Sequence, residues 1–190
     1  MIVEFHGFPG SGKTTVLAMI AQRALQGKST FGLSGKSVYT SFYCEGCYKL
    51  DPETLGQYDM SGSLLLIDEI SLYFDNRQFA SFTKEWLEFF KLHRHQQGCN
   101  LGYCSQSAKD ADLKIRTLVQ KSYIIDSYPF GFTAVKPICK FHTVIKGAPD
   151  QRFELAPVAE WKWCYRPKWY KYFDSFEKTK PLPKPEPVFW

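Results

Sequence analysis

The stretch GFPGSGKTT, residues 7–15, constrains the fold more than any other part of this 190-residue chain. It matches the pattern G-x-x-x-x-G-K-[S/T], a glycine-rich turn between a strand and a helix that surrounds phosphate groups with backbone N–H groups. The run MIVEFH before it is typical of a buried strand, and an apolar helical stripe follows it at Val16, Leu17, Ile20 and Ala24. Strand, loop and helix together predict an α/β domain that binds a nucleotide.

Each residue type in this phosphate loop (residues 7–15) suits contact with a nucleotide. Gly10 and Gly12 allow the tight turns that aim successive N–H groups at phosphate oxygens. Lys13 is expected to reach the β- and γ-phosphates, and Thr14 to offer its hydroxyl to Mg²⁺, which prefers oxygen ligands. The expected loop contacts are Gly7, Pro9, Gly10, Ser11, Gly12, Lys13, Thr14 and Thr15.

A carboxylate for the metal is supplied by the segment SLLLIDEI. Its four consecutive apolar residues, 64–67, predict a strand buried on both faces that ends at Asp68 and Glu69. Because ligands bind at the carboxyl ends of parallel strands, we expect Asp68 to lie near Thr14 and to hold Mg²⁺. Glu69 would orient or activate the attacking water, although either carboxylate would also suit a cap of the following turn.

Two further segments are predicted to complete this edge of the sheet. The run NLGYCSQ predicts a strand that delivers Gln106 to the edge, where a polar side chain would sense the γ-phosphate. Before it, spacings of three and four predict one amphipathic helix through Phe79, Phe82, Trp86, Phe90 and His93.

Arg94 and Arg116 are the candidates for an arginine that acts on the γ-phosphate, often from a neighbouring subunit. Such an arginine raises turnover by roughly 10³ to 10⁵ in nucleotide hydrolases. Arg94 stands in the sequence HRH at the end of the aromatic helix, where it would equally suit the negative end of the helix dipole. Arg116 lies in a short predicted helix beyond Gln106 and is better placed to face a neighbour.

The charge distribution argues against a protein that wraps DNA along its whole surface. The net charge is +5, and the last 30 residues hold seven Lys and Arg against three Asp and Glu, so the rest is nearly neutral. The N-terminus lacks a secretion pattern, and the six cysteines are therefore expected to be reduced thiols in the cytosol. The longest aliphatic run is far shorter than the roughly 18 to 20 residues that span a bilayer.

Composition changes near the C-terminus, so we predict a domain over residues 1–160 and an extension over 161–190. The segment WKWCYRPKWYKYFDSF contains three of the five tryptophans with interleaved Lys and Arg, and residues 178–190 are rich in proline. The aromatic and basic residues would suit stacking on single-stranded DNA, a membrane interface, a neighbouring subunit or packing back onto the domain.

The segment CEGC, Cys44 to Cys47, is a single C-x-x-C pair. Zinc normally takes four ligands, which His93, His95 and Cys99 would have to complete. The alternative is a pair of reduced thiols in a turn.

The order of motifs resembles the zonula occludens toxin-like (Zot) ATPases, relatives of filamentous-phage assembly proteins. The resemblance rests on the phosphate loop, LLLIDE, FDNRQF, FFKLHRH, a strand ending in SQ, and DLKIRTLVQ, over roughly residues 1–130. It implies an additional-strand P-loop NTPase, with the strand of Gln106 between those of the phosphate loop and Asp68. It also implies ATP-driven movement of phage DNA or virion assembly at the host inner membrane.

These observations lead to an expected Mg²⁺-dependent ATPase that forms homo-oligomers. Its expected partners are phage assembly or membrane proteins and single-stranded DNA, and its expected place is the host cytoplasm or the inner face of the cell membrane. Many relatives continue into a transmembrane helix, whereas this sequence ends at Trp190, so no membrane segment of its own is expected.

The alternatives are a packaging ATPase of another viral architecture and a scaffold that nucleotide locks without turnover. A regulatory GTPase is disfavoured because no N-K-x-D sequence is present, and a small kinase because no arginine-rich lid is evident.

Overall fold

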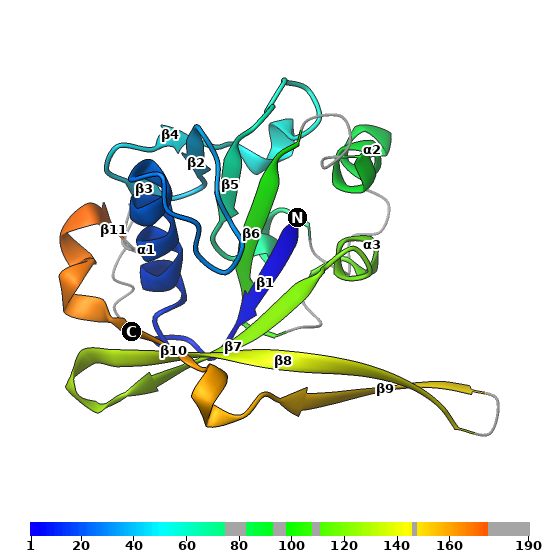
Figure 1. Cartoon of the computed structure of the whole chain (residues 1–190). Helices are drawn as coiled ribbons and strands as arrows, with labels where there is room; N and C mark the ends of the chain where they lie inside the picture. The colour runs from blue at the N-terminus through cyan, green and yellow to red at the C-terminus, as the bar shows by residue number, and fades with distance from the viewer. Residues whose placement is uncertain (75–82, 93–97, 108–110, 146–147, 175–190) are drawn as a thin grey trace, which may run out of the picture.

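A fully buried strand, β1 (Ile2–His6), leads through the phosphate loop into helix α1 (Lys13–Leu25), as the sequence predicted (Figure 1). The loop turns at Gly10 and Gly12, whose φ angles of 76° and 98° lie in the left-handed region that favours glycine. The computed structural model describes residues 1–74, 83–92, 98–107, 111–145 and 148–174.

One mainly parallel sheet organises this part of the chain. Its other strands are β2 (Val38–Thr40), β4 (Tyr48–Lys49), β5 (Leu64–Ile67), β6 (Asn100–Ser105), β7 (Lys121–Tyr128), β8 (Phe132–Ile145), β9 (Ala148–Leu155) and β10 (Lys162–Tyr165). The order is β10-β8-β7-β1-β6-β5-β2-β4, with β9 also paired to β8. Strands from β7 to β4 in this order pair in parallel, whereas β8 pairs antiparallel with β7, β9 and β10. The predicted α/β class is confirmed, and β6 lies between β1 and β5.

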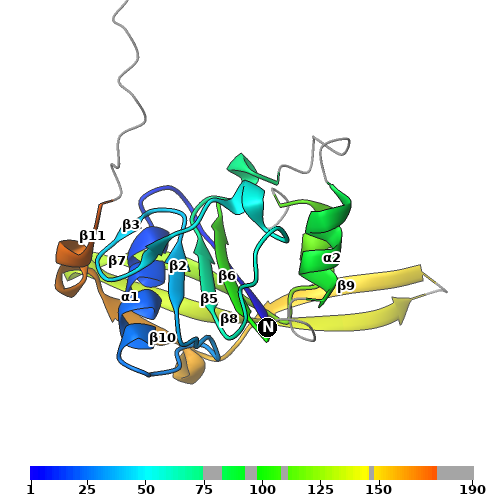
Figure 2. The same ribbon diagram turned by 90° about the horizontal axis from the view of Figure 1, so that it is seen from above.

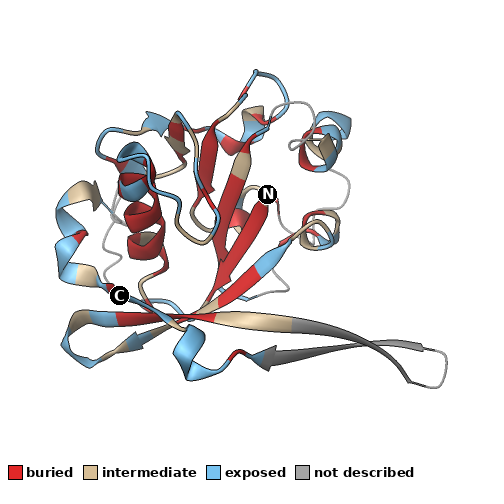
Figure 3. Ribbon diagram, viewed as in Figure 1, coloured by how far each residue is buried: buried red, intermediate tan, exposed pale blue. Residues whose placement is uncertain are grey.

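Both faces of the sheet are covered, which explains why β5 is apolar at every position. Leu64 and Leu66 pack into the core beneath α1, whereas Leu65 and Ile67 pack into the core on the opposite face. The elements on that opposite face are η1 (Pro52–Thr54), η2 (Ile70–Leu72), α2 (Lys84–Leu92) and α3 (Leu113–Arg116). Figures 1 and 2 show α1 apart from α2, and Figure 3 shows the buried strands between them.

Helix α2 is the described part of the predicted aromatic helix. Phe90 is buried, and its ring packs edge-on against Phe74 with centroids 5.5 Å apart. Trp86 packs in the same manner against Phe74 at 4.9 Å. The other predicted members of the stripe, Phe79, Phe82 and His93, lie outside the described residues.

The antiparallel half of the sheet has no counterpart in the sequence prediction, which placed no element between residues 127 and 160. Strand β8 pairs along one edge with β7, and along the other with β10 and then β9 (Figure 1). On β8, Val135 pairs with β10 and Ile138 pairs with β9. Pro137 lies between these two positions, where neither strand requires its missing N–H. A proline argues against a central strand, so the sequence pattern did not predict β8.

Residues 161–174, which we predicted as part of an extension beyond the domain, are built into it. Strand β10 joins the main sheet, and β11 (Phe173–Asp174) pairs antiparallel with β3 (Tyr43–Cys44). Between them lie the short turns η7 (Arg166–Lys168) and η8 (Tyr170–Tyr172). The physical reason is burial, because Trp169 retains only 9% of its accessible surface and Cys164 only 1%.

Among the helices that the structure describes, none combines the length and the apolar character needed to cross a bilayer.

Candidate functional site

The phosphate loop is held open by its own backbone and by strand β8. The N–H of Ser11 donates to the carbonyl of Phe8 at 3.1 Å, and the hydroxyl of Thr133 donates to the carbonyl of Ser11 at 3.0 Å. The hydroxyl of Ser11 is buried and has no partner among the described residues. A buried hydroxyl without a partner, in a loop with two left-handed glycines, fits a site that receives phosphate oxygens.

Lys13 spans the loop from the first turn of α1. Its ammonium donates to the carbonyls of Gly7 at 2.8 Å and Phe8 at 3.1 Å, and the residue is 9% exposed. These two bonds fix the ammonium at the inner side of the loop and leave a further N–H donor for a phosphate oxygen.

Thr14 and Asp68 meet at the junction of α1 and β5. The hydroxyl of Thr14 donates to Oδ2 of Asp68 at 2.7 Å, and the N–H of Asp68 donates to the hydroxyl of Ser41 at 2.9 Å. Burial raises the pKa of the Asp68 carboxyl, the bond from Thr14 lowers it, and the net shift is upward. A buried carboxylate beside a hydroxyl is a donor set that suits a hard cation such as Mg²⁺, which would offset the cost of burying this charge.

Glu69, the next residue, has a left-handed backbone with φ 50° and ψ 69°. This conformation is uncommon for a residue other than glycine, and such strain is concentrated at functional sites. The hydroxyl of Ser71 donates to Oε1 of Glu69 at 2.8 Å, which fixes the direction of the side chain.

Gln106 follows β6 directly, and its side chain is exposed. Because β6 lies between β1 and β5, Gln106 comes to the same edge of the sheet as the phosphate loop and Asp68.

Of the two predicted arginines, the structure describes only Arg116. Arg94 lies outside the described residues. Arg116 ends α3 half-buried, and its Nε is buried without a partner among the described residues. Burial and the nearby Glu4 raise the pKa of the Tyr103 phenol, and the charge of Arg116 opposes them. The charge of Arg116 therefore acts on Tyr103 in the sheet of its own domain.

Arg166, which the sequence analysis did not select, reaches the phosphate loop. Its Nη1 donates to the carbonyl of Gly10 at 3.5 Å, and its Nε donates to the carbonyl of Gly131 at 3.4 Å. Its side chain also covers Gly12, since a Cβ at that position would lie 3.0 Å from Cδ of Arg166. No spacing rule connects two segments so far apart in the sequence, so only the fold could identify this residue.

A pocket of about 620 Å³, here called the loop pocket, lies between the phosphate loop and the C-terminal segment. Its lining residues come from the loop with the start of α1, and from residues 166–174: Gly10, Gly12, Lys13, Thr14, Thr15, Arg166, Tyr170, Phe173 and Asp174. Figures 1 and 2 show that the C-terminal segment runs beside α1.

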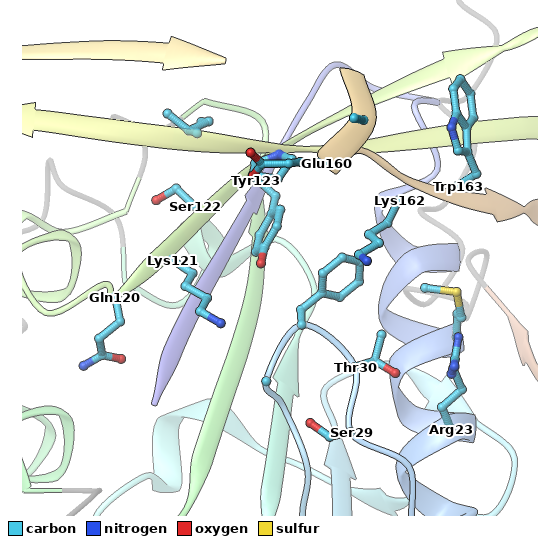
Figure 4. A pocket seen from close by; sticks show the side chains of 16 residues that line it. Arg23, Ser29, Thr30, Gln120, Lys121, Ser122, Tyr123, Glu160, Lys162 and Trp163 are labelled. Carbon is cyan, nitrogen blue, oxygen red and sulfur yellow. The ribbon is translucent and has the colours of Figure 1, made fainter. Parts of the chain in front are cut away.

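A second pocket of about 840 Å³, here called the basic pocket, lies between the later turns of α1 and the starts of β7 and β10. Arg23, Lys121 and Lys162 contribute three cations to its lining. Trp163 also belongs to the lining, but Figure 4 shows its ring, which is 51% exposed, pointing away from these cations. Glu160 is also part of the lining.

The thiols of Cys44 and Cys47 lie together. A hydrogen bond from Cys47 is the largest effect on Cys44 and lowers its pKa, whereas the same bond raises the pKa of Cys47. No group of three or more His, Cys, Asp or Glu side chains suited to a metal ion occurs in the described part of the chain. His93 and His95, the predicted additional ligands, lie outside it.

Residues 43–180 match the family model described as Zonular occludens toxin (Zot). The chain belongs to the Zot family. The predicted family is thereby confirmed, and the match includes Asp68, Glu69, Gln106 and Arg166. It begins after the phosphate loop, so in this Zot-family domain the loop is identified by its own pattern and geometry. No curated protein matches the chain.

Several solved structures resemble the Zot-family domain. The N-terminal domain of zonular occludens toxin from Neisseria meningitidis is 22% identical, with a TM-score of 0.49 over 91% of this chain and 98% of that chain. The genome packaging NTPase B204 from Sulfolobus turreted icosahedral virus 2, in complex with ATP-gammaS, is 17% identical, with a TM-score of 0.49 over 67% and 76%. The DNA-packaging ATPase B204 from Sulfolobus Turreted Icosahedral Virus is 16% identical, with a TM-score of 0.48 over 67% and 77%.

Proposed function

We propose that this Zot-family domain binds ATP with Mg²⁺ and hydrolyses it, in order to power filamentous-type virion assembly or the export of phage DNA. The observation that carries the proposal is the 2.7 Å bond between Thr14 and Asp68. It joins the helix that begins at the phosphate loop to the carboxylate at the end of β5, which is the arrangement that a nucleotide-bound Mg²⁺ requires.

The roles of the individual residues follow from their chemistry. The N–H groups of residues 10–13 would hold the phosphates, and Lys13 would carry its ammonium to the β- and γ-phosphates. Thr14 and Asp68 would hold Mg²⁺, which when bound neutralises charge on the transferring phosphate. Gln106 would donate its amide to the γ-phosphate from the neighbouring strand.

Glu69 is the proposed base or water-positioning residue. Its left-handed backbone and the bond from Ser71 hold the carboxylate in one direction beside Asp68. A fixed carboxylate beside the metal ligand suits orientation of a water for attack on the γ-phosphate.

The bond from Ser71 to Glu69 also favours a second candidate function, in which nucleotide locks a scaffold without significant turnover. A Glu69 carboxylate held on its own turn by Ser71 at 2.8 Å would first have to release that bond to accept a proton from water. Turnover measured at saturating ATP separates the two functions.

The domain is also proposed to form a homo-oligomer. In this assembly Arg94 or Arg116 of one subunit would contact the γ-phosphate bound to its neighbour. Arg116 would have to leave its half-buried position beside Tyr103 to do so, which makes Arg94 the preferred candidate.

Single-stranded DNA is the proposed cargo, and the basic pocket supports it. Arg23, Lys121 and Lys162 would contact phosphates (Figure 4). Phage assembly or membrane proteins are the proposed protein partners, with the domain in the host cytoplasm at the inner face of the membrane. A packaging ATPase of another viral architecture is the alternative for the same chemistry.

The deciding experiment measures ATP hydrolysis with and without Mg²⁺, with and without single-stranded DNA, alongside the oligomeric mass. We expect Mg²⁺-dependent turnover that Lys13→Ala abolishes and that DNA stimulates. Nucleotide binding without turnover under all of these conditions would favour the scaffold. Stimulation that persists in a Lys121→Ala, Lys162→Ala double variant would remove the basic pocket as the DNA site.

A further inference from the structure

We propose that residues 166–174, here called the C-terminal wall, form the second half of the nucleotide site, with Arg166 contacting phosphate and Tyr170 contacting the base. This inference rests on the proposed binding of a nucleotide at the phosphate loop, and it assigns a ligand to the loop pocket.

The position of the loop pocket fixes which part of a nucleotide would enter it. Lys13 and the pair of Thr14 and Asp68 mark the end of the site that takes the β- and γ-phosphates and Mg²⁺. Among the described residues that line the pocket, neither Asp68 nor Glu69 is present. The pocket shares Lys13 and Thr14 with that end and extends from them along Thr15 and the C-terminal wall, where we place the α-phosphate, the ribose and the base. Its volume of about 620 Å³ is in the range of small-molecule sites.

Arg166 brings a positive charge to the loop pocket, whose lining also includes the carboxylate of Asp174. Its guanidinium contacts two neutral carbonyls at 3.4 and 3.5 Å, which are long for charge-assisted bonds. Within the described part of the chain, no carboxylate forms an ion pair with it. A guanidinium has several N–H donors in a fork that matches phosphate, so Arg166 retains donors for a phosphate held by the loop.

The approach of Arg166 to the loop is tight. A Cβ on Gly12 would lie 2.7 Å from the hydroxyl of Thr133 and 3.0 Å from Cδ of Arg166. Gly12 therefore serves two needs, a left-handed backbone and the room for this arginine. The arginine stem forms part of the surface on which a bound phosphate chain would lie.

Two aromatic rings provide a surface for the base. Tyr170 is 50% exposed, and its ring centroid is 6.3 Å from that of Phe173, which is half-buried. Half-exposed rings beside a phosphate site suit stacking on a nucleobase, because each base presents a flat π-face. Tyr170 is the more accessible of the two rings and is assigned the contact.

The C-terminal wall is anchored to the domain, so the site is formed before a ligand arrives. Strand β11 pairs with β3, and the N–H of Glu45 donates to the carbonyl of Tyr172 at 2.8 Å. Trp169 is buried and packs near the ring of Tyr172, with centroids 6.2 Å apart. A wall that is already ordered loses little conformational entropy on binding.

The experiment compares two ligands in the presence of Mg²⁺, ATP and inorganic tripolyphosphate, by calorimetric titration of the full chain. Arg166→Gln is expected to weaken binding of both ligands about tenfold or more, since it removes a charge-assisted bond to phosphate. Tyr170→Ala is expected to weaken ATP about tenfold and to leave tripolyphosphate within about twofold. Tyr170→Phe should bind ATP like the wild type because it retains the ring.

Matched controls come from the same segment. Lys168→Ala removes an exposed cation from the turn next to Arg166, and Tyr165→Ala removes a ring that is 47% exposed but does not line the loop pocket. Both controls should bind both ligands like the wild type, and thermal unfolding confirms that each variant is folded.

The outcomes separate this inference from the proposed function. If the wild type binds neither ligand, or binds both equally well after Lys13→Ala, the nucleotide site itself is wrong. If binding depends on Lys13 but both wall variants match the controls, only the assignment of the C-terminal wall is overturned. If Tyr170→Ala weakens ATP and tripolyphosphate equally, the ring supports the loop and does not contact the base.

Discussion

The hydroxyl of Thr14, in the first turn of α1, donates a hydrogen bond of 2.7 Å to the carboxylate of Asp68 at the end of β5. The two residues are 54 positions apart, and the sheet order β1-β6-β5 brings them to one edge. This contact is the point at which the phosphate loop and the carboxylate become one site.

Lys13→Ala and Glu69→Gln should have different effects. Lys13→Ala should weaken ATP binding about tenfold or more, because its ammonium is the cation inside the loop. Glu69→Gln should leave ATP affinity within about threefold and lower turnover by about 10² to 10⁴, the usual worth of a general base. Titration with ATP and steady-state hydrolysis measure the two effects, and equal loss of affinity in both variants would show that Glu69 is structural.

Asp68→Asn should stabilise the protein in the absence of Mg²⁺. The folded state raises the pKa of Asp68, so it holds the proton more firmly than the unfolded state does. Stability is therefore lost as pH rises from the unfolded pKa of 3.8 through the higher folded value, and asparagine avoids this loss. Urea unfolding between about pH 4 and pH 7.5 should show a gain that grows with pH.

Asp59→Asn is the control of opposite sign. Hydrogen bonds from Ser61 lower the pKa of this exposed carboxyl, so its contribution to stability is present above pH 3.8 and is lost as pH falls. The variant should gain nothing at neutral pH. A pH-independent effect of Asp68→Asn would mean that its charge is not the cause.

Gly12→Ala should impair nucleotide binding more than Gly10→Ala does. Both glycines have a positive φ, so both substitutions strain the loop, at a cost on the order of 1 kcal/mol. Only the Cβ at Gly12 would also meet Thr133 and Arg166, since nothing lies within 4 Å of one at Gly10. ATP titration of the two variants tests the difference. Equal losses of ATP affinity would show that the contact between Gly12 and Arg166 does not contribute to binding.

Removal of residues 178–190 should leave a folded domain that binds nucleotide, because a proline-rich, charged segment buries little surface. Recruitment of a membrane or assembly partner should suffer instead. Truncation after Tyr165 should behave differently, since it also removes buried Trp169, whose loss alone costs about 3 to 5 kcal/mol. Circular dichroism during urea unfolding compares the two truncations, and loss of cooperativity in the shorter deletion would show that the tail belongs to the core.

Alanine variants of Arg94 and Arg116 test catalysis between subunits. If either acts on a neighbour, its variant should lose the dependence of the ATPase rate on protein concentration, with a fall of roughly 10³ or more in turnover. If both variants retain the concentration-dependent turnover of the wild type, neither arginine acts on a neighbouring subunit.

The parts of the site that the sequence predicted are those encoded over short distances. The loop pattern at residues 7–15 specifies strand, turn and helix together, and the run LLLI followed by Asp68 and Glu69 specifies a buried strand with its acidic end. Parallel pairing then requires these ends to share an edge.

Long-range pairing explains what the sequence could not predict. Strand β8 contains Pro137 and depends on three partners for its position, and β11 has only two residues. Arg166 therefore gave no signal, because its position on the loop results from pairing of β10 with β8 and of β11 with β3.

The contact between Arg166 and Gly10 has a consequence for synthesis of the protein. The two residues are 156 positions apart, and at about 5 to 20 residues per second the ribosome needs about 8 to 30 s between them. The phosphate loop thus leaves the ribosome long before the arginine that covers it, and a nascent chain would acquire its full affinity for nucleotide only after Arg166 has been added.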